Sequence, residues 1–505
     1  MYSQRSGSIP FCIFYHQKTK YSPEGLARRN HSIDWSHPPA TSKGYRSGTV
    51  YDLKPYLSDT EKVQSNGLLD RLSRLLYLTY GVTAVVPYPD GPFYMRAAPS
   101  AGGLYPAEVY LLSRGLPELP AGAYNYLVPA HTLVHFWSGE GWQGLSDACF
   151  DHPALKQAQI AIVISAVFQR SAWRYEDRAY RRIFLDSGHL LGNLELAAAL
   201  EAYRVRLITG FADDALNGLL FLPPSEEEAL AVAALVEADA PDHPPGRQAL
   251  PSPVHGNYPP VPEGQLLDYL HRVSKIDARP PTSPPAVVQA DKYNFPFCLK
   301  VSTQSGPLDW DAKLEETILR RRSTRRYTGE DLNFAELAWL LDFTYQPQHY
   351  AAQGFDPAPE FAHLELLSTF VAVLGVQGLE AGCYYYAPQA QELRQIRFKN
   401  FRPEIHHLCL GQDLGRDSAA VVFHTADLAA ATALYGERAY RTLHLDSGHL
   451  GQRLNLAAIR LGLGVSGIGG FFDDQVNEVL GIPEQEAVLY ITTLGRPARS
   501  ATADG

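Results

Sequence analysis

One stretch that occurs twice decides the fold: residues 180–190 read YRRIFLDSGHL, and residues 440–450 read YRTLHLDSGHL. The two stretches lie 260 residues apart, since Asp446 stands against Asp186. The same offset, without a gap, pairs GAYNY at 122–126 with GCYYY at 382–386, and GFADD at 210–214 with GFFDD at 470–474. This period is far too long for a solenoid repeat, so the sequence predicts a duplicated domain.

The segment between the copies is rich in proline. It contains PDHPPGRQALPSPVHGNYPPVPEG and ARPPTSPPAVV. Proline disfavours helix and lacks a backbone donor, so this composition predicts a linker. The expected organisation is an N-terminal extension at 1–50, copy one at 51–239, a linker at 240–290 and copy two at 291–500.

Each copy mixes strand and helix patterns. Apolar, β-branched runs such as Ile160–Ile164 and Val421–Phe423 are typical of buried strands. Residues 185–200 and 445–461 carry apolar side chains at helical spacing, and the Asp-Ser pairs near their beginnings suit a helix start. We therefore expect each copy to be α+β, a sheet flanked by helices.

Composition excludes several classes of protein. The 505 residues are 45% hydrophobic, which indicates ordinary globular domains. A net charge of −10 and the lack of a long basic run argue against a nucleic-acid partner. No secretory signal and no run of about 18 uncharged apolar residues is found, so we expect a cytoplasmic protein without membrane association. The five cysteines are far apart and form no C-x-x-C, so we expect neither a disulfide frame nor a metal site.

The two copies differ in complementary places. Copy one alone has PSAGGLYP at 99–106, leading into the strand-like EVYLL at 108–112, whereas copy two has PEFAHL at 359–364. Copy two alone has RRRSTRRY at 320–327, ahead of a helix opened by Asn333 with Glu336 at the capping-box position. Copy two alone also ends in LGRP at 494–497, and the copy-one counterpart of the arginine run, YLSDT at 56–60, has no arginine.

These motifs suit an anionic, flat ligand. Arginines around a Ser-Thr pair offer bidentate donors to a phosphate, although a solvated basic turn is the alternative. The Pro-Ser-Ala-Gly-Gly turn lets backbone N–H groups approach a ligand, although an ordinary tight turn fits as well. The run SGIGGF at 466–471 offers similar access; it is no G-x-G-x-x-G fingerprint, and we expect it to follow a helix rather than a strand. We assign His189 and His449, on apolar helix faces, to the core or an interface.

Together these motifs resemble a known family. RRSTR at 321–325, PSAGGLYP at 99–106, GIGGFFDD at 467–474 and LGRP at 494–497 are similar to the flavin-binding elements of the nitroreductase superfamily. The opening YHQKTK at 15–20 and the repeated LDSGHL helix resemble its SagB/ThcOx-type dehydrogenases. The resemblance covers nearly the whole chain, in two copies.

The resemblance implies where a cofactor binds. Nitroreductase-like proteins are typically homodimers with FMN at the subunit interface, where one subunit supplies the arginine-serine motif and the terminal arginine, and the other supplies the Pro-Ser turn. With the complementary losses, this predicts an intramolecular pseudo-dimer that keeps one FMN site. The implied cofactor-binding residues are Arg321, Arg322, Ser323, Arg325, Ile468, Gly469, Gly470 and Arg496 of copy two with Pro99, Ser100, Ala101 and Gly102 of copy one.

Roles follow from the same resemblance. We expect Arg321 and Arg496 at the phosphate, Arg325 at the N1/C2 edge of the flavin, and a backbone N–H of Gly469 or Gly470 facing N5. Azoline-oxidising members carry a Lys-Tyr pair where this chain has WRY at 173–175 and ALY at 433–435, so the lysine is absent from both copies.

The missing lysine shapes the catalytic prediction. Arginine stays protonated in proteins, so Arg174 is expected to orient an anion or carbonyl, and Tyr175 is the candidate acid or base. The alternative for residues 173–175 is a capped helix start with a packed aromatic side chain.

The sequence therefore predicts an FMN-dependent oxidoreductase that resembles the SagB/ThcOx-type dehydrogenases or oxidases. Its substrate would be a small organic molecule, such as a ring-containing peptide or other azoline, or an electron-poor aromatic, and NADH, NADPH or oxygen would complete the cycle. A broad-specificity NAD(P)H nitroreductase or quinone reductase is one alternative. A flavin-binding protein that has lost turnover is another.

Overall fold

The computed structural model describes residues 9–29, 32–57, 67–88, 91–241, 248–281, 284–285, 287–288 and 290–498. Each copy forms a 7-stranded antiparallel sheet, and the strand orders are β1-β6-β5-β4-β7-β9-β8 and β10-β15-β14-β12-β16-β18-β17. The orders are identical when strands are matched along the chain, so the structure confirms a duplicated α+β fold. Residues 58–60, part of the copy-one counterpart of the arginine run, lie outside the described residues.

The first sheet consists of β1 (Thr49–Asp52), β4 (Ala107–Ser113), β5 (Gly122–Leu127), β6 (Thr132–Ser138), β7 (Ile160–Val167), β8 (Tyr203–Ile208) and β9 (Glu227–Glu237). The second consists of β10 (Lys300–Ser302), β12 (Leu367–Val373), β14 (Gly382–Ala387), β15 (Glu392–Arg397), β16 (Ala420–Asp427), β17 (Gly464–Ile468) and β18 (Glu486–Gly495). Strands β7 and β16 contain the apolar runs predicted as strands, and they are buried because helices pack on both faces of each sheet.

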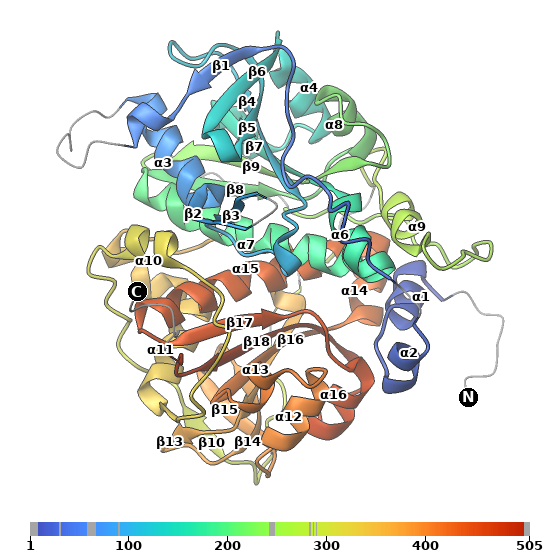
Figure 1. Cartoon of the computed structure of the whole chain (residues 1–505), viewed down its shortest axis with the longest axis vertical. Helices are drawn as coiled ribbons and strands as arrows, with labels where there is room; N and C mark the ends of the chain where they lie inside the picture. Colours follow the sequence, from blue (N-terminus) through green and yellow to red (C-terminus); the bar gives the residue numbers. More distant parts are fainter. Residues whose placement is uncertain are drawn as a thin grey trace.

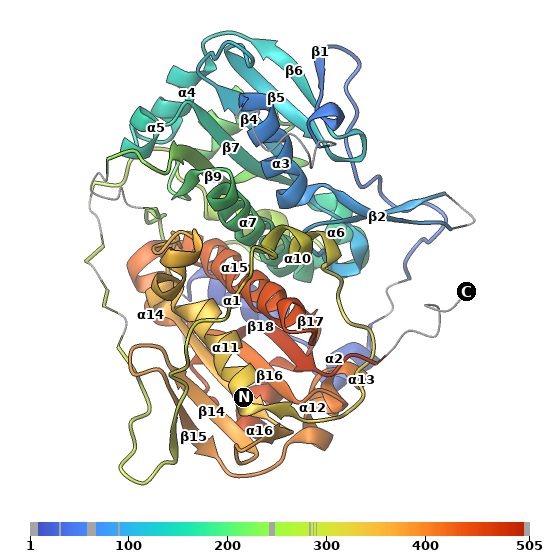
Figure 2. The same ribbon diagram turned by 90° about the vertical axis from the view of Figure 1, so that its left-hand side faces the viewer.

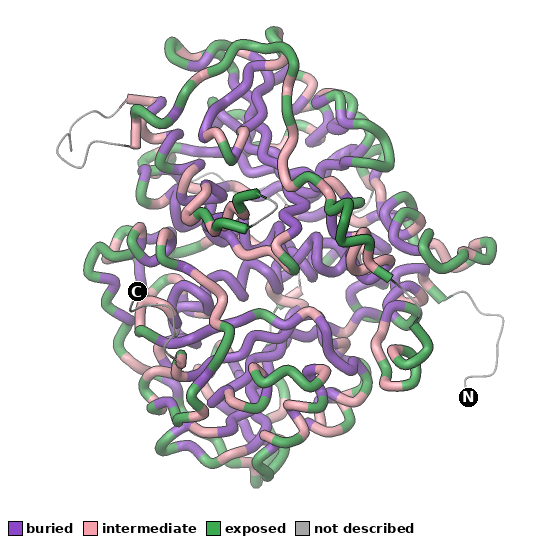
Figure 3. The backbone as a smooth tube through the Cα atoms, viewed as in Figure 1, coloured by how far each residue is buried: buried purple, intermediate pink, exposed green. Residues whose placement is uncertain are grey.

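Two long helices, α7 (Ala179–Leu200) and α15 (Ala439–Arg460), lie side by side between the sheets (Figures 1 and 2). They are buried along almost their whole length (Figure 3). A Cβ on Gly188 would lie 2.0 Å from the carbonyl oxygen of Leu445, and a Cβ on Gly448 would lie 2.1 Å from that of Leu185. The repeated glycine of LDSGHL therefore permits the close crossing that joins the two copies.

The sequence predicted that the Asp-Ser pairs begin these helices, and this prediction is wrong. Asp186 and Asp446 lie one third of the way into α7 and α15 and are buried. Each carboxylate instead accepts hydrogen bonds from a turn elsewhere in its own copy: Asp186 from Ala101 N–H, and Asp446 from Ala362 N–H. Tertiary hydrogen bonding thus replaces the local capping role that the residue types indicate.

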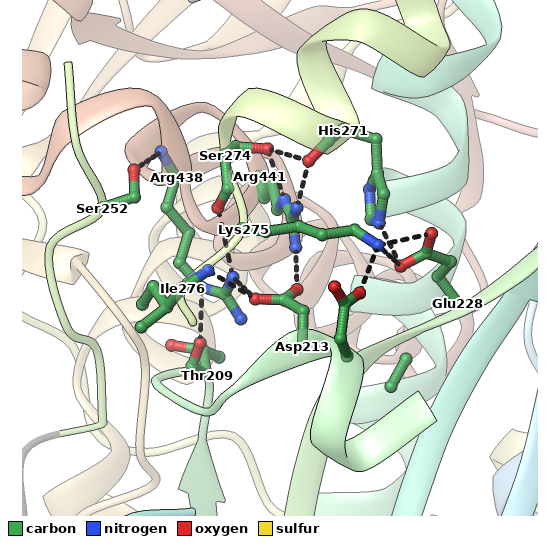
Figure 4. A network of polar contacts seen from close by, with 12 residues as sticks. Thr209, Asp213, Glu228, Ser252, His271, Ser274, Lys275, Ile276, Arg438 and Arg441 are labelled. Carbon is green, nitrogen blue, oxygen red and sulfur yellow. Dashed lines mark hydrogen bonds and ion pairs between the residues drawn. The ribbon is translucent and has the colours of Figure 1, made fainter. Parts of the chain in front are cut away.

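Ion pairs repeat across the interface with the same pseudo-symmetry. Asp213 of copy one accepts from Arg438 (2.6 Å) and Arg441 (2.7 Å) of copy two (Figure 4). At the 260-residue offset, Asp473 of copy two accepts from Arg178 (2.8 Å) and Arg181 (2.7 Å) of copy one. Burial opposes ionisation of both carboxyls, but the paired arginines outweigh it and hold their pKa values below the ordinary value.

Two short helices occupy equivalent places at these ion pairs. They are α1 (Phe11–Lys18), in the predicted extension, and α9 (Leu266–Val273), in the predicted linker. Arg181 donates to the carbonyl of His16, and Arg441 donates to that of His271. The linker composition disfavours helix, but 266–273 is free of proline and buries its leucines, which explains why α9 forms. The pseudo-symmetry thus extends into both segments.

Other helices flank these layers. They include α2 (Pro23–Ala27), α3 (Leu68–Tyr80), α6 (Phe168–Tyr175), α10 (Leu314–Arg320), α11 (Phe334–Tyr345), α14 (Leu428–Tyr435) and α16 (Asp473–Leu480). The capping box of Asn333 and Glu336 at the start of α11 is present as predicted. In copy one, the hairpin of β2 (Val82–Val86) and β3 (Phe93–Arg96) precedes the Pro-Ser turn.

Candidate functional site

A cavity of about 830 Å³ lies where motifs of the two copies meet. It is lined by Pro99, Ser100, Ala101 and Gly102 of the copy-one turn, and by Arg174 and Tyr175 at the end of α6. From copy two it is lined by Arg321, Ser323, Arg325, Ile468, Gly469 and Gly470. The cavity therefore brings together most residues that the resemblance assigned to the site, from segments far apart in the sequence.

The Pro-Ser turn is held in place by Asp186. Ser100 Oγ donates to Asp186 Oδ2 (2.6 Å), and Ala101 N–H donates to the same carboxylate (3.1 Å). Gly102 follows with a φ of 67°, a left-handed conformation that favours glycine. Burial raises the pKa of Asp186 to about 7, against the lowering effect of these hydrogen bonds.

Tyr175 and Arg174 reach the same turn from α6. A Cβ on Gly102 would lie 2.8 Å from the Tyr175 hydroxyl and 3.1 Å from Arg174 Nη1, so only glycine leaves room there. Both residues end α6, and they do not form the helix start that was the alternative. Burial raises the pKa of Tyr175, although Arg182 and Arg174 act against this shift. Its hydroxyl is thus protonated near neutral pH and can donate a proton.

The arginine run is hydrogen-bonded to the beginning of strand β17 (Gly464–Ile468). Thr324 N–H donates to the carbonyl of Val465 in β17 (2.8 Å), and Val465 N–H donates to Thr324 Oγ1 (2.9 Å). The glycine run therefore ends strand β17 rather than following a helix, which corrects the sequence expectation. The reason is that β17 pairs with β18 along its length, so Gly464–Ile468 is held extended.

Arg321 crosses from copy two into copy one. It is buried, and its guanidinium donates to the carbonyls of Ala97 and Arg96. Its Nη1 has no hydrogen-bond partner within the described part of the chain. Burial lowers the pKa of Arg321 to about 10, which still leaves it charged near neutral pH. A buried charged donor without a partner at a cavity wall fits an anionic ligand group.

Two predicted residues do not line the cavity. Arg322 donates to the hydroxyl (3.0 Å) and the carbonyl (2.9 Å) of Thr83 and so joins the copies. Arg496 forms a bidentate pair with Glu336, at 2.8 and 2.7 Å. The capping box of α11 positions this carboxylate, which pairs with the Arg496 guanidinium. Arg496 could contact a phosphate only if its ion pair with Glu336 were broken.

The structure adds residues that sequence reasoning missed. Asp186, Arg182, His189 and Tyr490 also line the cavity. His189 Nε2 lies 2.8 Å from the Tyr490 hydroxyl, and His189 Nδ1 lies 2.8 Å from Gln452 Oε1 across the interface, so the assignment of His189 to an interface is confirmed. Arg182 stands against Thr442 at the 260-residue offset, a difference between copies that was available as a signal. Asp186 has the same residue, Asp446, at its counterpart, so a comparison of the copies gives no signal for it.

The cavity has a pseudo-symmetric counterpart, at the 260-residue offset, where copy one occupies the place of the glycine run. There, protein groups accept hydrogen bonds from the backbone N–H groups. Glu360 accepts from Leu207 N–H (2.6 Å), and the carbonyl of Gln248 accepts from the N–H groups of Thr209 (2.6 Å) and Gly210 (3.0 Å). These three N–H groups correspond to those of 467, 469 and 470 at the open cavity. The two positions are therefore unequal: the N–H groups of Gly469 and Gly470 have no hydrogen-bond partner among the described residues and lie at a cavity, whereas protein groups fill the other position.

Comparison with known proteins places this geometry in a family. The model of the nitroreductase family matches residues 69–235 and 318–496, one region in each copy. The chain belongs to the nitroreductase family. It is therefore an oxidoreductase, and the resemblance inferred from its motifs is confirmed.

The similar proteins fall into two groups. The crystal structure of a protein from Anabaena variabilis that bears a nitroreductase name is 58% identical; the match covers 97% of this chain and 100% of that chain, with a TM-score of 0.93. A protein of Methanocaldococcus jannaschii, also named as a nitroreductase, is 31% identical over 35% of this chain and 89% of its own length. The first is thus similar across both copies of this nitroreductase, and the second over 179 residues, a stretch of about one copy's length.

Two proteins named as processing proteins are also similar. The Microcin B17-processing protein McbC of Escherichia coli is 30% identical over 25% of this chain, and the trifolitoxin-processing protein TfxF of Rhizobium leguminosarum bv. trifolii is 26% identical over 29%. The matched regions span only 48% and 55% of those two proteins. These relatives agree with the predicted likeness to the SagB/ThcOx-type branch.

None of the helices among the described residues is long and apolar enough to cross a membrane. The described ranges also contain no group of three or more His, Cys, Asp or Glu side chains that could hold a metal ion.

Proposed function

We propose that this nitroreductase is an FMN-dependent oxidoreductase with a single FMN site in the cavity between its copies. The observation that carries the proposal is the inequality of the two pseudo-symmetric positions. The open cavity measures about 830 Å³ and has a glycine turn at 101–103 and an Arg321 Nη1 without a partner among the described residues, whereas Glu360 and Gln248 fill the other position. An anionic, flat cofactor suits the first and has no room in the second.

Bound there, FMN supplies hydride transfer at its N5 atom. Arg321 and Ser323 would hold the phosphate, and Arg325 would place positive charge at the N1/C2 edge of the ring. The backbone N–H groups of Gly469 and Gly470 would face N5, because no Cβ obstructs them. Tyr175 would donate a proton to the substrate, and the Pro-Ser turn, held by Asp186, would cover one face of the site.

The substrate class is narrower than the fold alone implies. The position of the family's lysine is held by Arg174, which cannot accept a proton near neutral pH. This disfavours an azoline dehydrogenation that needs a lysine base. It favours a reductase, or a dehydrogenase in which Tyr175 is the only proton-transfer residue. A broad-specificity NAD(P)H nitroreductase or quinone reductase is the second candidate, because the cavity is large and walled by aromatic side chains such as Phe93 and Tyr105.

Cofactor stoichiometry and reduction test the proposal. The full chain, purified with added FMN and freed of excess, should hold about one flavin per chain, and NADH or NADPH added anaerobically should bleach it. Two flavins per chain would contradict the filled second position, and no flavin would overturn the proposal. A bound flavin that no donor reduces would favour a binding protein without turnover.

Tyr175→Phe separates catalysis from binding. Loss of the hydroxyl should slow turnover about 10²-fold or more, because general-acid catalysis is worth roughly that much, and leave the FMN content unchanged. Steady-state rates with a nitroaromatic or quinone acceptor, together with flavin absorbance, measure both effects. Unchanged rates would remove Tyr175 from the mechanism.

A further inference from the structure

Arg182 is a buried cation at the cavity, and it has no role in the proposed binding of FMN. It lies on α7, and it lines the cavity with only 7% of its surface exposed. Its Nη1 has no hydrogen-bond partner among the described residues. The neighbouring arginines of the same helix region, Arg178 and Arg181, are both paired with Asp473. Arg182 thus differs from them in holding a charge ready for a ligand.

The guanidinium of Arg182 is positioned between two parts of the site. Its central carbon lies 3.8 Å from the centre of the Tyr175 ring. On the other side, Arg182 Nε lies 3.4 Å from where a Cβ on Gly469 would be, and Nη2 lies 3.6 Å from that position on Gly470. The guanidinium thus lies against both the tyrosine ring and the glycine run, and an anion bound at its edge would lie next to both.

Arg174 adds a second cation beside the same tyrosine. Its Nη1 and the Tyr175 hydroxyl both lie close to Gly102. At the 260-residue offset, the counterparts of Arg174 and Arg182 in copy two are Leu434 and Thr442. The pair of cations is therefore found only at the open cavity, whereas Arg178 and Arg181 have the arginine counterparts Arg438 and Arg441. This difference separates the pair from the interface arginines, which serve the pseudo-dimer in both copies.

The charge balance also leaves these cations free. The charged residues that line the cavity are Arg174, Arg182, Arg321, Arg325 and Asp186. The carboxylate of Asp186 accepts hydrogen bonds from Ser100 and Ala101, and Arg182 lowers its pKa electrostatically without forming an ion pair with it among the described contacts. Arg321 and Arg325 come from the arginine run that would hold FMN, so Arg174 and Arg182 remain for a second anionic group.

We propose that Arg182 and Arg174 form an anion subsite that binds the carboxylate of a small aromatic substrate next to the Tyr175 hydroxyl. The proposal rests on the proposed function, and it names the substrate class of that site. Planar guanidinium groups match a carboxylate, and the aromatic walls at Tyr21, Phe93 and Tyr105 suit a ring. Arg182 orients the substrate, and Tyr175 supplies the proton.

Binding of benzoate and of its neutral isostere benzamide tests the subsite. Both affinities are measured by calorimetry on the full chain with FMN added, and FMN content is measured by absorbance. We expect benzoate to bind more tightly than benzamide, and Arg182→Met to reduce benzoate affinity about tenfold or more, because hydrogen bonds to charged groups are worth that much. Benzamide and FMN affinities should not change, and Arg182→Lys should restore part of the preference.

A matched control exists on α9. The guanidinium of Arg272 also stacks on a tyrosine, Tyr269, at 4.6 Å, but it is exposed and does not line the cavity. Arg272→Met should leave benzoate affinity unchanged. If Arg182→Met fails to fold, Arg174→Met, at a half-buried position, provides the same comparison.

The outcomes distinguish the subsite from the cofactor. Equal affinity of the wild-type chain for benzoate and benzamide would overturn the subsite. Loss of FMN affinity without loss of benzoate affinity in Arg182→Met would move Arg182 to the flavin, and loss of NADP⁺ affinity alone would move it to the donor's phosphates; both results overturn the proposal. If the chain binds no FMN, the proposed function fails, and the same titrations on the flavin-free chain still decide whether the anion subsite exists.

Discussion

At the scale of single residues, Arg321 is the side chain whose loss should be most specific for the cofactor. It is buried at the interface, and its Nη1, at the cavity, has no partner in the described part of the chain. Arg321→Ala should weaken FMN binding about tenfold or more, since it removes a charge-assisted contact. Arg28→Ala, at an exposed position after α2, should not weaken it. Flavin fluorescence titration measures both affinities, and equal effects would contradict the placement of the cofactor.

Asp186 should make stability depend on pH. Burial raises its pKa to about 7 in the folded chain, above about 3.9 in the unfolded chain. The folded state therefore holds this proton more tightly, and the stability it contributes is complete below about pH 4 and is lost as the pH rises through about 7. Asp186→Asn, which cannot ionise, should flatten the pH dependence of the free energy of unfolding over this range by a few kcal/mol at most.

Asp446 is the control for Asp186, because burial also raises its pKa to about 7 but it does not line the cavity. Asp446→Asn should flatten the same pH dependence and leave FMN affinity unchanged. Denaturant unfolding between pH 4 and 7.5 measures the slope. A slope that neither variant alters would show that these carboxyls titrate normally.

At the scale of elements, the crossing of α7 and α15 depends on the repeated glycine. A Cβ on Gly188 would meet backbone, which cannot move aside as a flexible side chain can. Gly188→Ala should therefore destabilise the chain by about 1–3 kcal/mol or more through overpacking. Gly218→Ala is the control: Gly218 lies in α8 (Asp213–Leu219), and no atom of the described residues beyond its own stretch of helix lies within 4 Å of the added Cβ. It should leave stability equal or slightly higher, because alanine favours helix. Thermal unfolding measures both, and a Gly188→Ala variant as stable as the wild type would show that the helices can separate at little cost.

At the scale of the whole molecule, the two copies contribute matching ion pairs to stability, whereas the proposed FMN site lies at only one of the two equivalent positions. Asp213→Asn and Asp473→Asn each leave two buried arginines without their carboxylate, so both should destabilise the chain by about 3–5 kcal/mol. Only Asp473 also accepts from the backbone of Tyr21, which lines the cavity. Asp473→Asn should thus weaken FMN binding, and Asp213→Asn should not. Unfolding and flavin titration of both variants measure this, and equal loss of flavin would contradict a single site on one side.

The sequence by itself determined the duplication, the α+β class, the strands β7 and β16, the capped start of α11 and the family. Each of these follows from a local pattern or from a fixed offset, and both can be read directly from the order of residues along the chain. The complementary loss of PSAGGLYP in copy two and of the arginine run in copy one also predicted which segments meet at the cavity.

Only the tertiary structure decided the rest, because it depends on partners that are remote in sequence. Asp186 looks like a helix-start residue but is a buried acceptor for Ser100 and Ala101, and Arg496 looks free but is held by Glu336. Helix α9 forms within a proline-rich segment because its leucines find a buried surface. Arg182 has the same residue type as Arg178 and Arg181, and only the positions of the surrounding carboxylates show that, among the described residues, Arg178 and Arg181 pair with Asp473 while Arg182 Nη1 has no partner.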